Sequence, residues 1–312
     1  MRLAGPEEVG RYASVYVSAR DGEVALSCAG RIQWELTQGL SILVVTLFGP
    51  AGEPAPAACD HLAAGLSFDS GQFDTLEASP ASAVDGEASR GGLQLEAVRI
   101  LDDVIRRARP RRLYVPLGLG EQPERRLAHE AALRTFQRGV ERDILLYEER
   151  PDVFVSGSVR IRLGQLGARL PPAASRVAGE AGLARYLLRL HTVPQVREGR
   201  GWSERMRWTR LATRQWLAAR AWRPEKAFGP RLQPVLHRAD AASLAGLLQT
   251  VRAEASRAGA PEAAGDRFLS FVTDYARRLG AQGYVERLWL LLPERDEDRG
   301  APVGAQQPIN RG

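Results

Sequence analysis

The chain has 312 residues, of which 44% are hydrophobic, and a formal net charge of +6. This length allows one large α/β domain, and the apolar fraction excludes a mainly disordered chain. No apolar run reaches the roughly 18 residues of a transmembrane helix, and the N-terminus has no apolar signal-peptide segment. Two cysteines, Cys28 and Cys59, are too few for a disulfide framework or a cysteine-based zinc site, so we expect a reducing, cytoplasmic setting.

The charge is unevenly distributed. Residues 1–100 contain 6 arginines and 13 acidic residues, a formal charge of −7, so the remainder carries +13. Lys226 is the only lysine. A GC-rich genome is the simplest cause of this arginine content, and the charge by itself does not favour a nucleic-acid partner.

The first 150 residues alternate predicted strands with predicted helices. Strands are predicted at 12–18, 40–48, 112–116 and 144–147, and helices at 23–40, 93–108 and 125–139. Residues 50–92 are rich in Gly, Ala, Pro and Ser and predict a loop with one short helix near 59–66. Such β-α repeats predict an α/β fold with a Rossmann-like, mostly parallel sheet and flanking helices.

The pattern changes after residue 150. Residues 153–163 predict a strand or hairpin, and 284–292 a late strand. Helices are predicted at 173–190, 203–222, 239–258 and 266–279. We therefore expect a core at 1–150, a helix-rich C-terminal part of the same domain at 151–292, and a flexible tail at 293–312.

Two segments follow predicted strands at the edge where open α/β sheets bind ligands. Residues 18–30 read SARDGEVALSCAG, and residues 116–127 read PLGLGEQPERRL. The first resembles the S-P-H-x-D-D-x-x-L-S-x-G-G motif of the LmbE-like deacetylases, the superfamily of N-acetylglucosaminyl-phosphatidylinositol de-N-acetylase (PIG-L). The second resembles their P-L-G-x-G-x-H-x-D-H-R-L motif. Residues 147–151 (YEERP) and 283–289 (GYVERLW) resemble two further family segments in the same order.

This resemblance implies hydrolysis of an N-acetyl group from an amino sugar. The family's zinc ion is held by His, Asp and His, a second Asp is the general base, and a further His stabilises the intermediate. The resemblance places the first zinc-ligand His on Arg20, the base Asp on Gly22, the ligand Asp on Glu23, the acid His on Gln122, an Asp on Glu124 and the last zinc-ligand His on Arg125. We therefore assign no catalytic residue and no metal ligand to the chain.

Chemistry explains why these replacements oppose zinc binding. Arginine stays protonated and has no lone pair to donate, so Arg20 and Arg125 repel a divalent cation. Gly22 has no group that accepts a proton. Two alternatives follow for the cleft. Either the two arginines pair with Glu23 and Glu124 and fill the vacated centre, or one arginine stays free and binds a carboxylate or phosphate.

The remaining candidate residues point less clearly to chemistry. His129 lies one helical turn after Arg125 and is the one histidine that could join Glu124 in a rebuilt metal site. His61 has no partner that the sequence can place, and His191 and His237 are expected at the surface or at caps. Cys28 predicts a buried helix–sheet contact rather than a nucleophile, and the adjacent Asp102 and Asp103 predict a solvated helix face.

Residues 200–238 carry ten basic residues against two acidic ones and contain four tryptophans. Arg207, Arg210 and Arg214 share a helical face and predict a basic surface. The favoured interpretation is an amphipathic helix whose tryptophans pack inward and whose arginines are solvated. A docking site for an acidic partner, including a second copy of this chain, is the alternative.

Three functions remain open at this stage. The favoured hypothesis is a catalytically inactive deacetylase homologue that binds an anionic small molecule or a sugar conjugate. A protein that only assembles with a partner, or with itself as a homo-oligomer, is the second hypothesis. An active amino-sugar N-deacetylase with a remodelled metal centre is the third, and Glu23, Glu124 and His129 would then carry the reaction.

Overall fold

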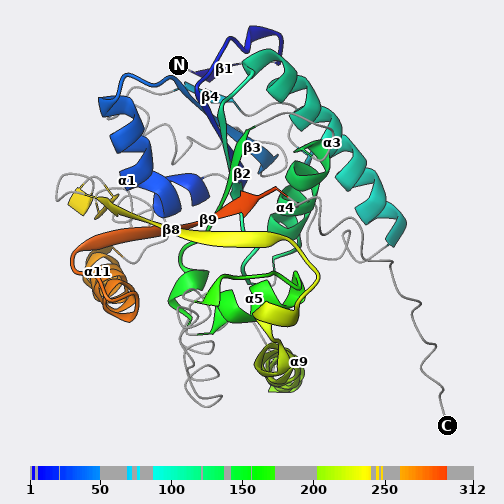
Figure 1. The fold of residues 1–312 in the computed structure, drawn as a ribbon, viewed down its shortest axis with the longest axis vertical. Helices are drawn as coiled ribbons and strands as arrows, with labels where there is room; N and C mark the ends of the chain where they lie inside the picture. The colour runs from blue at the N-terminus through cyan, green and yellow to red at the C-terminus, as the bar shows by residue number, and fades with distance from the viewer. Residues whose placement is uncertain are drawn as a thin grey trace.

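The structure is a computed structural model. It describes residues 2–3, 6–20, 22–49, 69–71, 76–77, 87–120, 122–136, 142–155, 157–172, 202–239, 244–245, 247–248 and 261–293. Within this part the fold is mixed α/β, with one mostly parallel sheet and helices on both of its faces (Figure 1). The predicted fold class is therefore confirmed. No helix of the described part is both long and apolar enough to cross a membrane.

The described strands form one nine-stranded sheet in the order β1-β4-β3-β2-β6-β7-β9-β8, with β5 beside β3. Their bounds are β1 Arg2–Leu3, β2 Ser14–Arg20, β3 Ile42–Gly49, β4 Asp69–Gly71, β5 Leu76–Glu77, β6 Arg112–Pro116, β7 Asp143–Tyr147, β8 Arg231–Ala239 and β9 Tyr284–Leu292. Strands β1 to β7 pair in parallel. Strand β9 runs antiparallel between β7 and β8, so the late strand completes the sheet begun by the first 150 residues.

The helices cover the two faces unequally. Their bounds are α1 Glu23–Thr37, α3 Glu87–Ala108, α4 Pro123–Phe136, α5 Ser158–Gln165, α9 Trp202–Ala221 and α11 Pro261–Arg278, with short 3-10 turns η1 Pro6–Glu8, η2 Asp152–Phe154 and η3 Pro224–Lys226. Helix α1 lies on one side of the central strands, α3 and α4 lie together on the other, and α5 and α9 lie below the strand ends (Figure 1).

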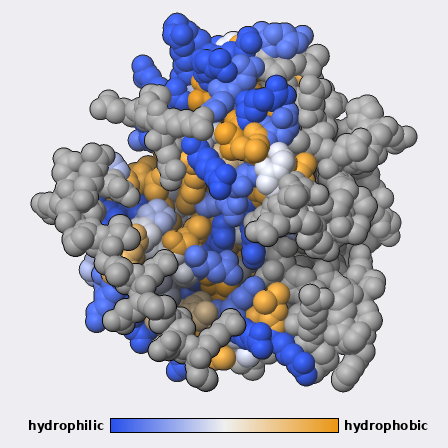
Figure 2. Space-filling model, turned by 90° about the vertical axis from the view of Figure 1, so that its right-hand side faces the viewer, coloured by the Kyte–Doolittle hydropathy of each residue, from blue (hydrophilic) through white to orange (hydrophobic). Residues whose placement is uncertain are grey.

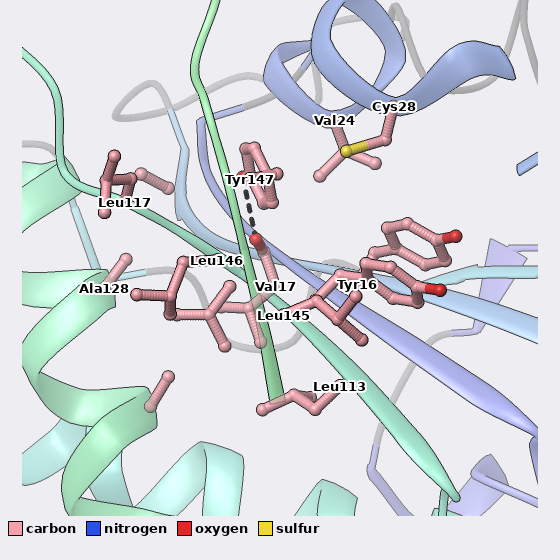
Figure 3. Packing of buried hydrophobic residues seen from close by; sticks show 14 of the residues in the cluster. Tyr16, Val17, Val24, Cys28, Leu113, Leu117, Ala128, Leu145, Leu146 and Tyr147 are labelled. Atoms are coloured by element: carbon pink, nitrogen blue, oxygen red, sulfur yellow. Dashed lines mark hydrogen bonds between the residues drawn. The ribbon is translucent and has the colours of Figure 1, made fainter. Parts of the chain in front are cut away.

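The core lies between these layers and continues from the first strands into β9. Strands β2 and β3 are buried almost throughout because helices cover both of their faces. Tyr16 and Tyr114 stack with ring centroids 4.1 Å apart. The Tyr147 hydroxyl donates to Val17 O at 2.9 Å below the fully buried Cys28 (Figure 3). On the face shown in Figure 2, hydrophobic residues of the described part are interspersed with hydrophilic ones.

The prediction of a strand or hairpin at 153–163 is wrong. The chain forms η2 and then α5, which begins after Gly157 at φ 94°. β-branched residues such as Val159 and Ile161 favour a strand. However, Val159 and Leu163 are spaced four apart, so both can bury in the core from one helix face. Tertiary burial therefore outweighed local β propensity.

The sequence did not predict strand β8. The helix predicted to begin at Ala239 is wrong at that residue, because Ala239 is the last residue of β8. Pro234 argues against a central strand, but β8 lies at the sheet edge, where proline is tolerated. Residues 50–92 contain β4, β5 and the first turns of α3, which begins at Glu87 instead of residue 93. The helices predicted at 59–66 and 173–190, and most of 240–258, lie outside the described residues.

Candidate functional site

The two segments singled out in the sequence lie next to each other at the carboxyl ends of β2 and β6. These parallel strands are neighbours, so the turns that follow them lie at one edge of the sheet. Residue Gly22, at φ 80°, lets the chain turn from β2 into α1. Residues Gly118 and Gly120, at φ 81° and 77°, do the same between β6 and α4. The resulting site draws on α1, α4 and η2.

Arg125 is the buried centre of the site. Its Nε donates to Glu23 Oε1 at 2.6 Å, its Nη1 donates to Asp152 Oδ2, and its side chain is only 3% exposed. Burial alone would lower the pKa of Arg125, but Glu23 and Asp152 outweigh it and raise the pKa. The guanidinium thus joins the first turn of α1, the first turn of α4 and η2 through charge-assisted hydrogen bonds.

Arg20 forms the outer ion pair. Its Nη2 donates to Glu124 Oε1 at 2.6 Å, with side-chain exposures of 46% for Arg20 and 7% for Glu124. The backbone N–H of Arg20 donates to Glu23 Oε2 at 3.4 Å. The structure thus pairs Arg20 with Glu124 and Arg125 with Glu23, and neither guanidinium lacks a carboxylate.

The charges of this cluster do not favour an additional anion. Two guanidiniums, Arg20 and Arg125, face three carboxylates, those of Glu23, Glu124 and Asp152. Of the two alternatives that the sequence left open, the pairing alternative matches this geometry. Anion binding by Arg20 or Arg125 stays a prediction that would require one of these pairs to break.

The other replaced positions offer little reactive chemistry. Residue Gly22 has no side chain, and its backbone begins α1. Gln122 lies just before α4 and is half-buried, with its Oε1 buried and unpaired. Glu124 Oε2 is also buried without a hydrogen-bond partner.

His129 does not complete a metal site with these residues. It is 1% exposed, and its Nδ1 lies 2.8 Å from Pro116 O, a carbonyl that can only accept, so Nδ1 carries the proton. Burial, reinforced by the charge of Arg162, lowers the pKa of His129 to about 3. Within the described residues, no group of three or more His, Cys, Asp or Glu side chains could hold a metal ion. The residues present therefore do not fit the zinc centre that the resemblance implies.

Glu149 supports the loop between β6 and α4. It is fully buried, and its Oε1 accepts hydrogen bonds from Gly118 N at 2.5 Å and Leu119 N at 3.0 Å. Its Oε2 has no partner. Burial raises the pKa of Glu149 to about 8, although the nearby Arg125 acts in the opposite direction.

The neighbours of Glu149 in the chain anchor the site to the late strand. Glu148 accepts hydrogen bonds from Arg287 Nε at 2.6 Å and Trp289 Nε1 at 2.7 Å. Arg150 is buried and donates to Leu26 O at 3.2 Å and Val285 O at 2.7 Å. The segments YEERP and GYVERLW, noted in the sequence without individual roles, thus meet in one buried network.

The same network provides acceptors for the backbone N–H groups at a break in α1. Cys28 has non-helical dihedral angles, so the helix begins again after it and leaves N–H donors without intrahelical acceptors. Glu286 of β9 accepts from Gly30 N at 2.8 Å and Arg31 N at 2.9 Å. A residue 256 positions later therefore caps the second part of the helix that carries Glu23.

Sequence reasoning missed Asp152 and Glu149 as parts of the site. Asp152 lies just before the segment 153–163 for which a strand or hairpin was predicted, and nothing in its local pattern indicates that η2 returns toward α4. Glu149 belongs to a segment that was noted, but its contact with the 118–119 loop depends on the pairing of β6 with β7.

The other candidates lie away from this cluster. Cys28 is buried, and burial raises the pKa of its thiol, as expected for a packing residue. His237 was expected at the surface or at a cap. It lies within the edge strand β8, half-buried beside Trp34, and is therefore not a capping residue. Asp103 pairs with Arg106 and Arg107 on the outer face of α3. Residues 59, 61 and 191 lie outside the described part.

The predicted basic surface lies on α9, which is remote in sequence from the cluster. Arg210 and Arg214 are exposed, whereas the side chain of Arg207 lies outside the described part. Trp216 packs against a small core of Val155, Ile161, Ala212 and Ala219. The inward tryptophan and outward arginines agree with the amphipathic interpretation.

Comparison with known proteins identifies the fold. No family model and no curated protein sequence matches the chain. The zinc-inhibited form of teicoplanin deacetylase Orf2 matches with a TM-score of 0.56 and 15% identity, over 91% of this chain and 99% of that one. The A40926 pseudoaglycone deacetylase Dbv21 matches with a TM-score of 0.53 and 14% identity, over 90% of this chain and 98% of that one. The chain therefore has the fold of these deacetylases, and the resemblance found in the sequence is confirmed at the level of fold.

Proposed function

We propose that this chain is a non-hydrolytic member of the deacetylase fold, in which arginine–carboxylate pairs fill the position of a hydrolytic zinc centre. The observation that carries the proposal is the buried contact of Arg125 with Glu23 and Asp152. At the corresponding positions the resembling family has a zinc-ligand His and a zinc-ligand Asp. A guanidinium there supplies fixed positive charge and no lone pair.

The geometry also argues against a remodelled hydrolase. That alternative needs Glu23, Glu124 and His129 as ligands or bases. Each carboxylate has one oxygen committed to an arginine, and His129 is held neutral with Nδ1 directed at a backbone carbonyl. Gly22, at the position of the family's general base, has no side chain that could take a proton from water.

The proposal includes a binding or assembly role in place of catalysis. The structural neighbours are named as deacetylases of teicoplanin and of A40926 pseudoaglycone. By analogy of fold, a sugar conjugate is the first ligand to test for binding to this chain. A partner protein on the basic face of α9, and a cytoplasmic location, stay predictions of the same proposal.

Zinc content of the purified full-length chain tests the loss of the metal centre. The protein is incubated with zinc, desalted and measured by elemental analysis. We expect no stoichiometric zinc in the wild type because two guanidiniums occupy ligand positions. The triple variant Arg20→His/Glu23→Asp/Arg125→His, which restores the family's ligand types, is expected to gain about one zinc per chain if it remains folded.

One tightly held zinc per wild-type chain would overturn the proposal. Turnover of an N-acetyl amino sugar by the wild type that disappears in Glu23→Ala would do the same. Circular dichroism of each variant separates loss of metal binding from loss of folding.

A further inference from the structure

Arg162 of α5 is a buried guanidinium that contacts no counter-ion among the described residues. It is only 8% exposed, and its Nε donates to Leu117 O at 2.9 Å. Its Nη2 is buried with no hydrogen-bond acceptor, and no described carboxylate forms an ion pair with it. A buried charge is costly unless it is paired, so this arrangement requires an explanation.

The fold makes room for this guanidinium. Gly118 lies directly against it, and a Cβ at that position would be 2.9 Å from Arg162 Nη2 and 3.2 Å from Nε. Gly118 also has a φ of 81°, which disfavours any side chain. The guanidinium therefore lies against the backbone that follows β6, close to the loop that Glu149 supports.

Within the described part of the chain, the charges that act on Arg162 do so without forming an ion pair with it. Arg126 lies within electrostatic range and has the same sign, whereas Glu149 and Glu130 oppose it. Glu149, with its pKa raised to about 8, is mostly protonated at pH 7. Burial lowers the pKa of Arg162 only to about 10, so it keeps its charge.

We propose that Arg162, which lies within electrostatic range of Arg126, binds a small oxyanion such as a carboxylate or phosphate group against the backbone at Gly118. Nε is held by Leu117 O, so the Nη2 hydrogens are left to donate to an oxyanion in a charge-assisted hydrogen bond. The proposal assigns the anion to Arg162, because Arg20 and Arg125 are already paired. It goes beyond the proposed loss of hydrolysis and does not depend on it.

Calorimetric titration of the full chain tests this site. Inorganic phosphate and acetate are titrated separately at pH 7. The ionic strength is kept constant by replacing chloride with the titrated anion. We expect one equivalent of at least one oxyanion to bind, and the arm that binds distinguishes a phosphate from a carboxylate ligand. Arg162→Gln, which keeps a donor for Leu117 O, is expected to weaken binding at least tenfold.

Matched variants locate the bound anion. Arg160→Gln lies on the same helix, but Arg160 Nε donates to Ala219 O of α9, so binding should be unchanged. Arg20→Gln should also leave binding unchanged. Arg126→Gln, which removes the second positive charge, should weaken it several-fold and keeps the proposal testable if Arg162→Gln misfolds.

Absence of binding by both oxyanions would overturn the proposal. So would equal affinity in the wild type and a folded Arg162→Gln variant. Loss of binding in Arg20→Gln but not in Arg162→Gln would assign the anion to the zinc-like position and overturn it as well. None of these results changes the zinc measurement, so the two proposals fail independently.

Discussion

At the scale of single residues, Arg125 decides the chemistry of the site. It satisfies two carboxylates from different elements in a place where water is largely excluded. Such a cluster is costly to form, because each charge loses its hydration, but it is more costly to leave half-formed. From the sequence, pairing of Arg20 and Arg125 with Glu23 and Glu124 was one of two alternatives. Asp152, the third member, was brought in by η2.

Arg125→Gln is expected to destabilise the fold by about 3–5 kcal/mol, because it leaves Glu23 and Asp152 buried without their cation. Urea unfolding at pH 7, fitted for the free energy of unfolding, measures the change. Arg277→Gln is the matched control, since its pair with Asp274 is solvent-exposed and is expected to contribute about 0–1 kcal/mol. A loss below about 1 kcal/mol for Arg125→Gln would contradict the role assigned to this cluster.

Glu149 makes stability depend on pH. Its pKa is about 8 in the folded chain and close to the ordinary value of about 4.5 when unfolded, so the folded state holds an extra proton between these values. As pH rises from about 4.5 to 8, Glu149 therefore lowers the free energy of unfolding by up to about 1.4 kcal/mol per pH unit. His129, with its lowered pKa, acts in the opposite direction below about pH 6.5.

Glu149→Gln removes this dependence and still offers an oxygen to Gly118 and Leu119. The variant is therefore expected to gain stability relative to the wild type as pH rises from 5 to 8. Thermal unfolding at several pH values measures the difference. A constant difference between the two proteins across this range would show that Glu149 is ionised throughout.

At the scale of elements, distant caps and turns position the site. Helix α1 continues past its break at Cys28 because Glu286 of β9 accepts from Gly30 and Arg31. The sequence predicted one uninterrupted helix there because apolar spacing does not register a single non-helical residue. For α5, the sequence predicted a strand or hairpin where the structure has a helix. Its β-branched residues favour a strand, but burial of Val159 and Leu163 on one face selects the helix.

At the scale of the whole molecule, the late strand joins the two halves of the chain. Strand β9 lies between β7 and β8, and Glu148 links β7 to Arg287 and Trp289. We therefore propose that residues 1–293 form one cooperative unit and that residues 294–312 contribute little to it.

Truncation tests this organisation. A chain ending at Pro293 is expected to keep a melting temperature within a few degrees of the full chain, whereas a chain ending at Gly280 should lose cooperative unfolding. The reason is that the shorter chain leaves Glu148 and Arg150 buried without their β9 partners. Cooperative unfolding of the shorter chain near the wild-type temperature would indicate an independent N-terminal domain.

Local pattern was enough to predict the β-α alternation of the first 150 residues and the late strand, because the spacing of apolar residues reports which faces are buried. The two motifs also indicated that Arg20, Glu23, Glu124 and Arg125 lie at one edge of the sheet, since the carboxyl ends of neighbouring parallel strands share that edge. Asp152, Glu149, Glu286 and the unpaired Arg162 became visible only in the tertiary structure. Their roles depend on contacts between segments far apart in the chain, and these contacts leave no periodic signal in the sequence.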